Sequence, residues 1–281
     1  MSARLEDAGD RLIIWNGNTD KRGALSPELY ACIAEATEKA ADPRIRAVIL
    51  TAEGPFFCAG GDLNALIERR KMTETARRAK IEELHDLVRG MRAAPVPFIA
   101  AVEGGAAGAG LSLALACDLI VAAQDAKFTA AYVKAGLVPD GGLTASMARL
   151  LPRALSMEMC LFGRAVPAAR FADLGAVNHL SEPGQALSDA MALVDALAQG
   201  PRTAQGAIKG LVADAYDVPV AQQLDSERNA FAAAAGTTIF TAATSSASST
   251  AASSTTAATT TAFATAAAAS SRCFWLFSSF S

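Results

Sequence analysis

Two glycine-rich segments carry the residues of this chain that are best suited to do chemistry. Residues 56–63 (FFCAGGDL) follow an apolar stretch at 47–51 (AVILT), and residues 103–111 (EGGAAGAGL) follow another at 98–102 (FIAAV). Glycine lets backbone N–H groups approach a ligand closely, because no side chain intervenes. A pair of such N–H groups at helix starts can hold an oxyanion that develops during a reaction. The two segments therefore indicate chemistry at the carbonyl group of an acyl thioester.

The residues around the first segment predict the elements that must position it. Residues 11–16 alternate as a strand does, while Ser26, Pro27 and Glu28 supply an N-cap, a proline at the first helical position and an acidic first turn. The helix that they begin is expected to run to about residue 41, and a strand is expected at 46–51. Residues 64–92 are highly charged with helical spacing, which predicts two surface helices or one broken helix.

Further elements follow the second segment, and the chain becomes mainly helical after residues 139–142 (PDGG). Residues 105–116 are small and apolar on all sides, which predicts a buried helix after a strand at 98–102, and a further strand is expected at 118–122. Helices are then expected at 143–151, 154–162, 167–174, 184–198, 201–213 and 220–235. Strands that alternate with helices, followed by a helical region, predict an α/β fold.

The composition narrows the class of protein. The 281 residues include 28 acidic and 25 basic ones, for a formal net charge of -3, and this near-balance argues against nucleic-acid binding, which needs a basic surface. The five cysteines show no CxxC spacing and there are only two histidines, so we expect reduced thiols, no disulfides and no metal site. The first residues contain several charges and no apolar run of signal-peptide length. We therefore expect a soluble cytoplasmic protein that does not bind a membrane.

The composition changes abruptly near the end of the sequence. Residues 229–271 hold no charged residue, and after Gly236 the chain is almost wholly Ala, Ser and Thr. Such a run lacks the large apolar residues that build a core. Its many hydroxyl groups argue against a membrane span, despite the absence of charge. We interpret residues 237–281 as an aberrant or disordered tail, which intact-mass analysis and resequencing of the gene would test.

The chain resembles the enoyl-CoA hydratase/isomerase (crotonase) superfamily, because the two glycine segments stand in order with several further motifs. These lie at residues 22–26 (RGALS), 116–120 (ACDLI), 135–139 (AGLVP), 151–153 (LPR), 162–164 (FGR) and 172–177 (ADLGAV). The resemblance covers about residues 10–235. It implies a crotonase-like spiral of ββα units over residues 1–200, followed at 201–236 by a C-terminal helical region of the kind used for trimerisation. It also implies an acyl-CoA substrate and a homotrimer or hexamer.

The resemblance also assigns roles to individual residues. The backbone N–H groups of Gly61 and Ala109 would be the two oxyanion donors, since Ala109 matches the middle glycine of the family's second motif. Because both donors belong to the main chain, alanine at position 109 is compatible with this role when the backbone angles suit it. The positions expected to contact the CoA moiety are Arg22, Ala24, Asp62 and Leu63, and the further positions expected to contact substrate are Ala59, Gly61, Gly108, Ser112 and Tyr132.

The same comparison of positions bears on the reaction. Family members that hydrate a 2-enoyl thioester use two carboxylates to orient and activate one water. Here the matching positions are Ser112 and Tyr132, which are not strong bases near neutral pH. Asp140 instead matches the lone acid of the family's enoyl-CoA isomerases and ring-CoA isomerases, and a single carboxylate suffices for a 1,3-proton shift. The resemblance therefore implies an acyl-CoA isomerase that converts a 3-enoyl-CoA to a 2-enoyl-CoA, without a metal or redox cofactor.

Two other functions stay open at this point. An enoyl-CoA hydratase would require that Glu103 or Asp140 hold a water in the pocket. A non-catalytic protein that binds CoA esters would have lost the chemistry. A dinucleotide-binding loop is a poor match, because the second segment lacks the GxGxxG order and no suitable acid lies about 20 residues further on.

Four other residues with reactive side chains are expected to be structural. Glu103 stands at the end of a strand, and Glu158 is expected as a buried acid on a helix. His85 falls in a charged stretch, which predicts a solvated surface position. Cys58 has no partner histidine at a recognisable spacing, so we expect it to line a pocket and not to act as a nucleophile.

Overall fold

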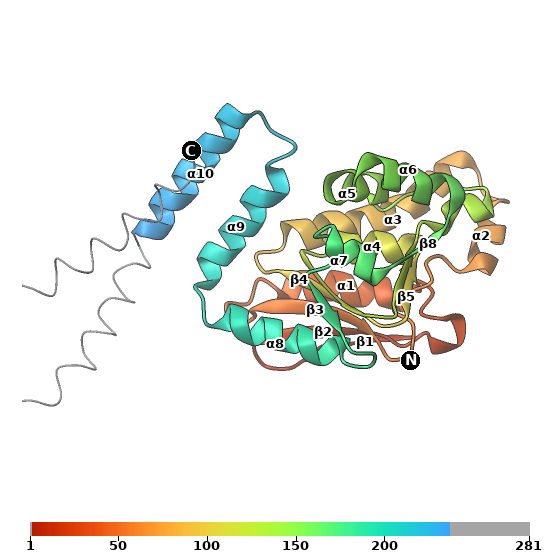
Figure 1. Ribbon diagram of the computed structural model, residues 1–281, viewed down its shortest axis with the longest axis horizontal. Coiled ribbons are helices and arrows are strands. Elements are labelled where there is room, and N and C mark those ends of the chain that lie inside the picture. Colours follow the sequence, from red (N-terminus) through yellow and green to blue (C-terminus); the bar gives the residue numbers. More distant parts are fainter. Residues whose placement is uncertain (1, 237–281) are drawn as a thin grey trace, which may run out of the picture. The chain divides into compact units, whose positions relative to one another are not determined.

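A six-stranded sheet runs through the part of the chain that the computed structural model describes, which is residues 2–236 (Figure 1). Its strands, in spatial order, are β1 (Ala3–Asp7), β2 (Arg11–Asn16), β3 (Ala47–Ala52), β4 (Phe98–Val102), β6 (Leu119–Ala123) and β9 (His179–Ser181). β1 and β2 pair antiparallel, and the other neighbours are parallel. The predicted tail at 237–281 lies outside the described residues.

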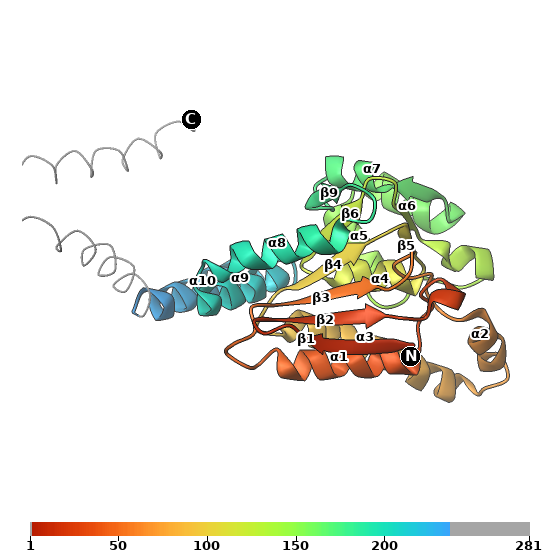
Figure 2. The same cartoon turned by 90° about the horizontal axis from the view of Figure 1, so that it is seen from below.

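Alternating apolar side chains give this sheet two buried faces. One face, with Leu12 and Ile14 of β2, joins the main core against α1 (Pro27–Lys39). The opposite face, with Ile13, packs against α8 (Ala186–Ala198), as Figure 2 shows. A largely parallel sheet that is covered on both sides needs strands that are apolar throughout. This explains the uninterrupted apolar stretches that precede both glycine segments.

A second, smaller sheet pairs β5 (Gly105–Ala107), β7 (Lys127–Thr129) and β8 (Ala165–Pro167). The chain passes from the large sheet to the small one and then into a helix, since β4 leads to β5 and to α4 (Ala109–Ala116). β3 leads in the same way to Cys58, which bridges to Ala106 of β5, and then to α2 (Leu63–Arg69). This repeated succession is the ββα arrangement that the resemblance implies. The predicted α/β crotonase-like fold is confirmed.

The remaining helices lie close to their predicted positions. They are α3 (Glu74–Ala93), α5 (Leu143–Leu150), α6 (Arg153–Phe162), α7 (Ala168–Asp173), α9 (Arg202–Asp214) and α10 (Val220–Ala235), with short 3-10 helices η1 (Thr19–Lys21) and η2 (Ala131–Ala135). Ser26 caps α1 as predicted, because its hydroxyl accepts a hydrogen bond from the Leu29 N–H at 3.2 Å. The predicted helix at 105–116 is wrong at its start. Gly105 and Gly108 have φ of +145° and +52°, which interrupts a helix, so residues 105–107 form β5.

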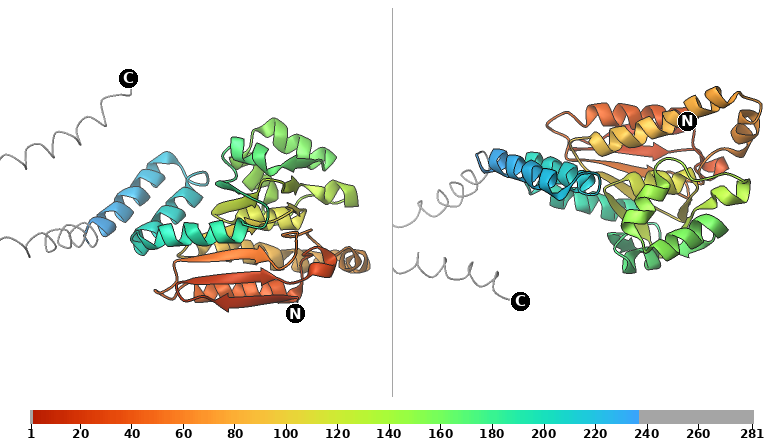
Figure 3. Two further views of the ribbon diagram at one scale, coloured as in Figure 1. Left: turned by 60° about the horizontal axis from the view of Figure 1, so that its bottom comes forward. Right: turned by 90° about the horizontal axis from the view of Figure 1, so that it is seen from above.

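A buried lysine anchors the C-terminal helices to the large sheet. The ammonium group of Lys209 on α9 donates to the carbonyl oxygens of Met91 at 2.7 Å and Val96 at 3.0 Å, and it pairs with Asp118 at 2.9 Å. α10 runs beside α9 (Figure 3), and the side-chain amide of Gln223 donates to a carbonyl of α9 at 3.0 Å. Within residues 2–236, no helix combines the length and the apolar character that a membrane crossing needs.

Candidate active site

The two glycine segments meet at the start of α4. The Ala107 N–H donates to the Cys58 carbonyl oxygen at 2.9 Å, which joins the segments side by side. A Cβ on Gly60 would lie 2.7 Å from the Ala107 carbonyl oxygen and 3.0 Å from the Ala109 backbone nitrogen. Gly60 also has a φ of +94°, which side chains rarely permit. The glycine is therefore what lets the first segment pass directly beside the first residue of α4.

The two expected oxyanion donors are free where this junction forms. Among residues 2–236, the backbone N–H groups of Gly61 and Ala109 have no hydrogen-bond acceptor. Neighbouring N–H groups are engaged: Ala59 donates to the Arg22 carbonyl oxygen at 3.0 Å, and Gly108 donates to a carbonyl of β7 at 3.0 Å. Ala109 is the first residue of α4, where an N–H has no partner within the helix and lies at the positive end of the helix dipole. Two free donors of this kind can bind an oxygen that carries negative charge.

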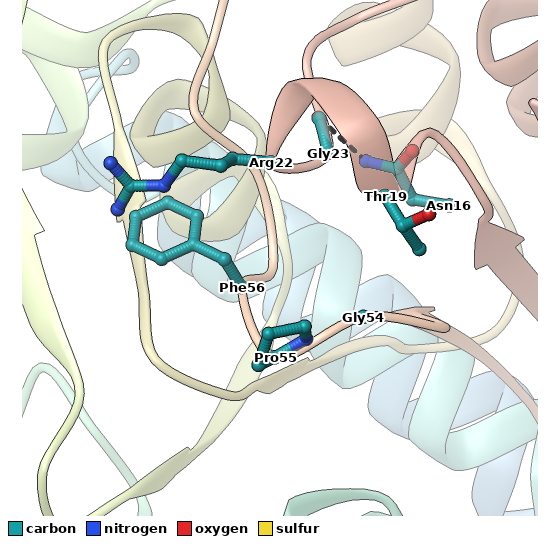
Figure 4. A pocket seen from close by; sticks show the side chains of 7 residues that line it. All are labelled: Asn16, Thr19, Arg22, Gly23, Gly54, Pro55 and Phe56. Atoms are coloured by element: carbon teal, nitrogen blue, oxygen red, sulfur yellow. Dashed lines mark hydrogen bonds between the residues drawn. The ribbon is translucent and has the colours of Figure 1, made fainter.

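A small pocket lies in the neighbouring loop, as Figure 4 shows. It has a volume of about 240 Å³ and is lined by Asn16, Thr19, Arg22, Gly23, Gly54, Pro55 and Phe56. The Arg22 guanidinium lies over the Phe56 ring, 4.2 Å from its centroid. Arg22 adopts a left-handed backbone conformation with a φ of +53°. Its cation and the adjacent aromatic ring are suited to a ligand that carries both an anionic group and a flat ring.

Three more of the predicted substrate-binding residues lie close in sequence to the residues that line this pocket. Ala24 is buried, whereas Leu63 on the first turn of α2 is 68% exposed. Asp62 caps α2, because its carboxylate accepts from the Asn64 N–H at 2.8 Å. The same carboxylate pairs with Lys21, and this bond lowers the pKa of Asp62. The side chain of Asp62 is thus occupied in holding the loop.

A chain of hydroxyl groups leads to Asp140. The Tyr132 phenol donates to Oδ1 of Asp140 at 2.7 Å. The Ser112 hydroxyl lies 2.8 Å from the Tyr132 oxygen and 2.9 Å from the backbone carbonyl oxygen of Asp140. Ser112 follows Ala109 by three residues on α4, about 5 Å along the helix axis. One helix therefore carries both an expected oxyanion donor and the residue that contacts Asp140.

Burial determines the protonation state of the Tyr132 phenol. Tyr132 is only 8% exposed, and its burial, reinforced by the charge of Asp140, raises the pKa of the phenol well above its ordinary value. The phenol therefore stays protonated near neutral pH and donates to the carboxylate. Ser112 is fully buried, whereas Asp140 is half-buried. The arrangement presents one carboxylate, supported by two neutral hydroxyl groups.

Two of the other reactive side chains are structural, as predicted. The Glu103 carboxylate accepts from the N–H groups of Gly184 at 3.0 Å and Ala186 at 2.9 Å, so it caps the start of α8. Cys58 is buried, and burial raises the pKa of its thiol to about 12. A thiol that stays protonated is a poor nucleophile.

The prediction for Glu158 is wrong. Its side chain is 48% exposed and pairs with Arg164 at 3.1 Å, because α6 turns Met159 and not its neighbour toward the core. His85 on α3 lies at the surface, where its side chain is 33% exposed and stands 3.5 Å from Glu82. Neither residue belongs to the site.

The sequence does not predict the contacts among Ser112, Tyr132 and Asp140. They are 20 and 8 residues apart along the chain, and hydrogen bonds over such distances leave no periodic pattern. One local signal does exist in Gly141, which has a φ of +60°. A Cβ there would lie 2.9 Å from the Ser112 Cβ, so the glycine lets Asp140 approach α4.

Comparisons with known proteins identify the family of this chain. The family model described as enoyl-CoA hydratase/isomerase matches residues 17–245. An enoyl-CoA hydratase of Mycobacterium tuberculosis is 33% identical over 211 residues, which are 74% of this chain and 79% of that protein. A 1,2-epoxyphenylacetyl-CoA isomerase of Escherichia coli is 34% identical over 216 residues, which are 75% of this chain and 81% of that protein.

Solved structures give the same result. The crystal structure of an enoyl-CoA hydratase from Polaromonas sp. JS666 is similar with a TM-score of 0.80 and 42% sequence identity, over 83% of this chain and 91% of that chain. The sequence matches, the fold and the contact between the two glycine segments thus all indicate the same family. The chain belongs to the enoyl-CoA hydratase/isomerase family.

Proposed function

We propose that this protein is an acyl-CoA isomerase that moves the double bond of a 3-enoyl-CoA to position 2. The observation that carries the proposal is the lone Asp140 carboxylate, whose partners Ser112 and Tyr132 occupy the positions where the family's hydratases have their two carboxylates. Hydroxyl groups at these positions are poor bases. One base that takes a proton and returns it elsewhere is what a 1,3-proton shift needs.

In the proposed reaction the thioester carbonyl oxygen binds the N–H groups of Gly61 and Ala109. The Asp140 carboxylate takes a proton from C2, and the electron pair of that C–H bond moves into an enolate whose negative oxygen the two donors stabilise. The protonated Asp140 then returns the proton to C4, where the π electrons of the C3–C4 double bond form the new C–H bond. The enolate oxygen re-forms the carbonyl group, and the electrons between C1 and C2 form the C2–C3 double bond in conjugation with it. No electrons leave the substrate, so we propose no redox cofactor.

The CoA moiety is proposed to lie along the loop of Arg22 and the first glycine segment. The pocket between Arg22 and Phe56 supports this placement, because a guanidinium pairs well with phosphate and an aromatic ring stacks on a base. Lys21 is paired with Asp62, whereas Arg22 forms no ion pair within the described part of the chain. Arg22 is therefore the cation that is available for the CoA phosphates.

A homotrimer or hexamer is proposed as the assembly. The support is a set of exposed apolar side chains on α9 and α10, where Ile208, Val212, Leu224 and Phe231 are 58%, 66%, 59% and 73% exposed. Exposed apolar patches mark interaction surfaces. The family resemblance identifies a second copy of the chain as the occupant, and light scattering of the purified protein tests it.

A hydratase is the second candidate, favoured by the hydratase names of the Mycobacterium tuberculosis and Polaromonas proteins. The two functions are separated by adding a 3-enoyl-CoA and a 2-enoyl-CoA in parallel and following the ultraviolet absorbance of the conjugated enoyl thioester. An isomerase raises this absorbance with the 3-enoyl substrate. Loss of absorbance with the 2-enoyl substrate, and no rise with the other, would replace the isomerase by a hydratase.

A further inference from the structure

We propose that Tyr132 and Ser112 are positioning residues: the Ser112 hydroxyl orients the Tyr132 phenol, and the phenol holds the Asp140 carboxylate in the position of an ionised base. The inference rests on the proposed isomerase function and deepens it. It gives the two residues a role other than contact with the acyl group.

The number of hydroxyl protons determines which group donates in each of these hydrogen bonds. Each hydroxyl group has one proton to donate, and an ionised carboxylate only accepts. The Tyr132 proton is committed to Oδ1 of Asp140 at 2.7 Å, so Ser112 is the donor in the contact of 2.8 Å with Tyr132, and it shares its one proton between the Tyr132 oxygen and the Asp140 carbonyl oxygen at 2.9 Å. A phenol that accepts one hydrogen bond donates the next one more strongly. The chain therefore runs from Ser112 through Tyr132 to the carboxylate.

One carboxylate oxygen is left for chemistry. Oδ1 of Asp140 is occupied by Tyr132, whereas Oδ2 has no hydrogen-bond partner within residues 2–236. A carboxylate that is held by one oxygen can turn only about the direction of that bond. The free oxygen is thus the one that can take a proton from C2 and return it to C4.

The backbone of Asp140 is held from the same side. Its carbonyl oxygen lies 2.9 Å from the Ser112 hydroxyl, whose one proton it shares with the Tyr132 oxygen, and it accepts from the Leu143 N–H at 3.2 Å. Gly141 packs against Ser112 and Leu84, where an added Cβ would come within 2.9 Å and 3.0 Å of their side chains. Because Ser112 and Ala109 both lie on α4, the same helix positions the Asp140 base and one oxyanion donor.

The kinetic test uses Tyr132→Phe, Ser112→Ala and the double variant, with Tyr216→Phe as a control, since Tyr216 is 71% exposed. Loss of a hydrogen bond to a charged group predicts that kcat of Tyr132→Phe falls roughly 10-fold, with little change in KM. Ser112→Ala is expected to show a smaller loss, and the loss in the double variant is expected to be smaller than the product of the two single losses, because Ser112 acts on Asp140 partly through Tyr132.

Two kinetic outcomes would overturn the inference. An unchanged kcat in Tyr132→Phe would show that the phenol does not position the base. A loss as large as that of Asp140→Asn would show that Tyr132 takes part in the proton transfer itself.

A measurement without substrate separates this inference from the proposed function. The chain has only three tyrosines, so the ¹³Cζ resonances of tyrosine-labelled protein can be assigned with Tyr132→Phe and Tyr216→Phe. The Tyr132 resonance is expected to shift in Asp140→Asn, which replaces the carboxylate that accepts the phenol proton by a neutral amide, and the Tyr216 resonance is expected to stay fixed. A resonance that is insensitive to Asp140 would overturn the inference. A resonance that moves in a protein that does not isomerise 3-enoyl-CoA would refute the proposed function alone.

Discussion

Adding one methyl group at Gly60 tests the junction on which the oxyanion donors depend. Two costs are expected for Gly60→Ala. A side chain at a φ of +94° is strained, which costs about 1–2 kcal/mol. The new Cβ would also stand 2.7 Å from the Ala107 carbonyl oxygen and 3.0 Å from the Ala109 nitrogen. Both atoms belong to the backbone and cannot rotate away, so overpacking adds about 1–3 kcal/mol.

The chain offers a matched control in Gly9. Its φ is +90°, and an added Cβ would find nothing within 4 Å, so Gly9→Ala has the same backbone strain without the contact. We expect Gly9→Ala to lose about 1–2 kcal/mol of unfolding free energy and to keep its kcat. Gly60→Ala is expected to lose about 2–5 kcal/mol. Its kcat is expected to fall on the order of 100-fold, since displacement of Ala109 removes an oxyanion donor.

The assays are urea unfolding of both variants and isomerisation of a 3-enoyl-CoA. The difference between the two variants isolates the steric contact from the backbone strain. If Gly60→Ala unfolds at the same urea concentration as Gly9→Ala and keeps full activity, then the two segments do not meet as described.

Three further predictions concern residues outside the reaction. Lys209→Met leaves the Asp118 carboxylate without its cation, so urea unfolding should show a loss of about 2–4 kcal/mol, and an unchanged midpoint would contradict the anchoring role of Lys209. Burial raises the pKa of Tyr30 to about 12. The neutral phenol therefore contributes stability that is complete below the ordinary tyrosine pKa of about 10 and is lost as the pH rises through about 12. The free energy of unfolding, measured at several alkaline pH values, should fall less steeply with pH in Tyr30→Phe than in the unaltered protein. Equal slopes for the two proteins would contradict the prediction. Glu103→Gln weakens the cap of α8, which should cost about 1 kcal/mol in thermal unfolding without lowering kcat; a large loss of kcat would revive Glu103 as a catalytic acid.

Local patterns predict most of the elements of this fold. The strands at 11–16 and 98–102 have their predicted bounds, and α1 begins after Ser26, because capping residues and apolar runs act over a few neighbours. The short strands β5 and β7 are absent from the predictions. Each has only three residues, and each exists because a distant partner supplies its hydrogen bonds.

The site likewise has some features that the local sequence predicts and others that it does not. The glycine segments predict N–H donors at helix starts, which are a local feature, and the family resemblance assigns this role to Gly61 and Ala109. The contact between Tyr132 and Asp140 depends on how η2 and the loop before α5 fold over α4, and no local pattern encodes it. The buried ion pair of Lys209 with Asp118 escapes prediction for the same reason, because a lone lysine in an amphipathic helix looks solvated.

The kcat of Asp140→Asn for a 3-enoyl-CoA tests the central claim most directly. Asparagine keeps the size of the side chain and accepts the hydrogen bond of Tyr132, but it cannot take a proton from C2. Asp125→Asn serves as the control, because Asp125 is an exposed carboxylate outside the site. The single-carboxylate mechanism predicts a loss of at least about 100-fold in Asp140→Asn and none in Asp125→Asn. An Asp140→Asn variant that isomerises the substrate at the rate of the unaltered protein would contradict it.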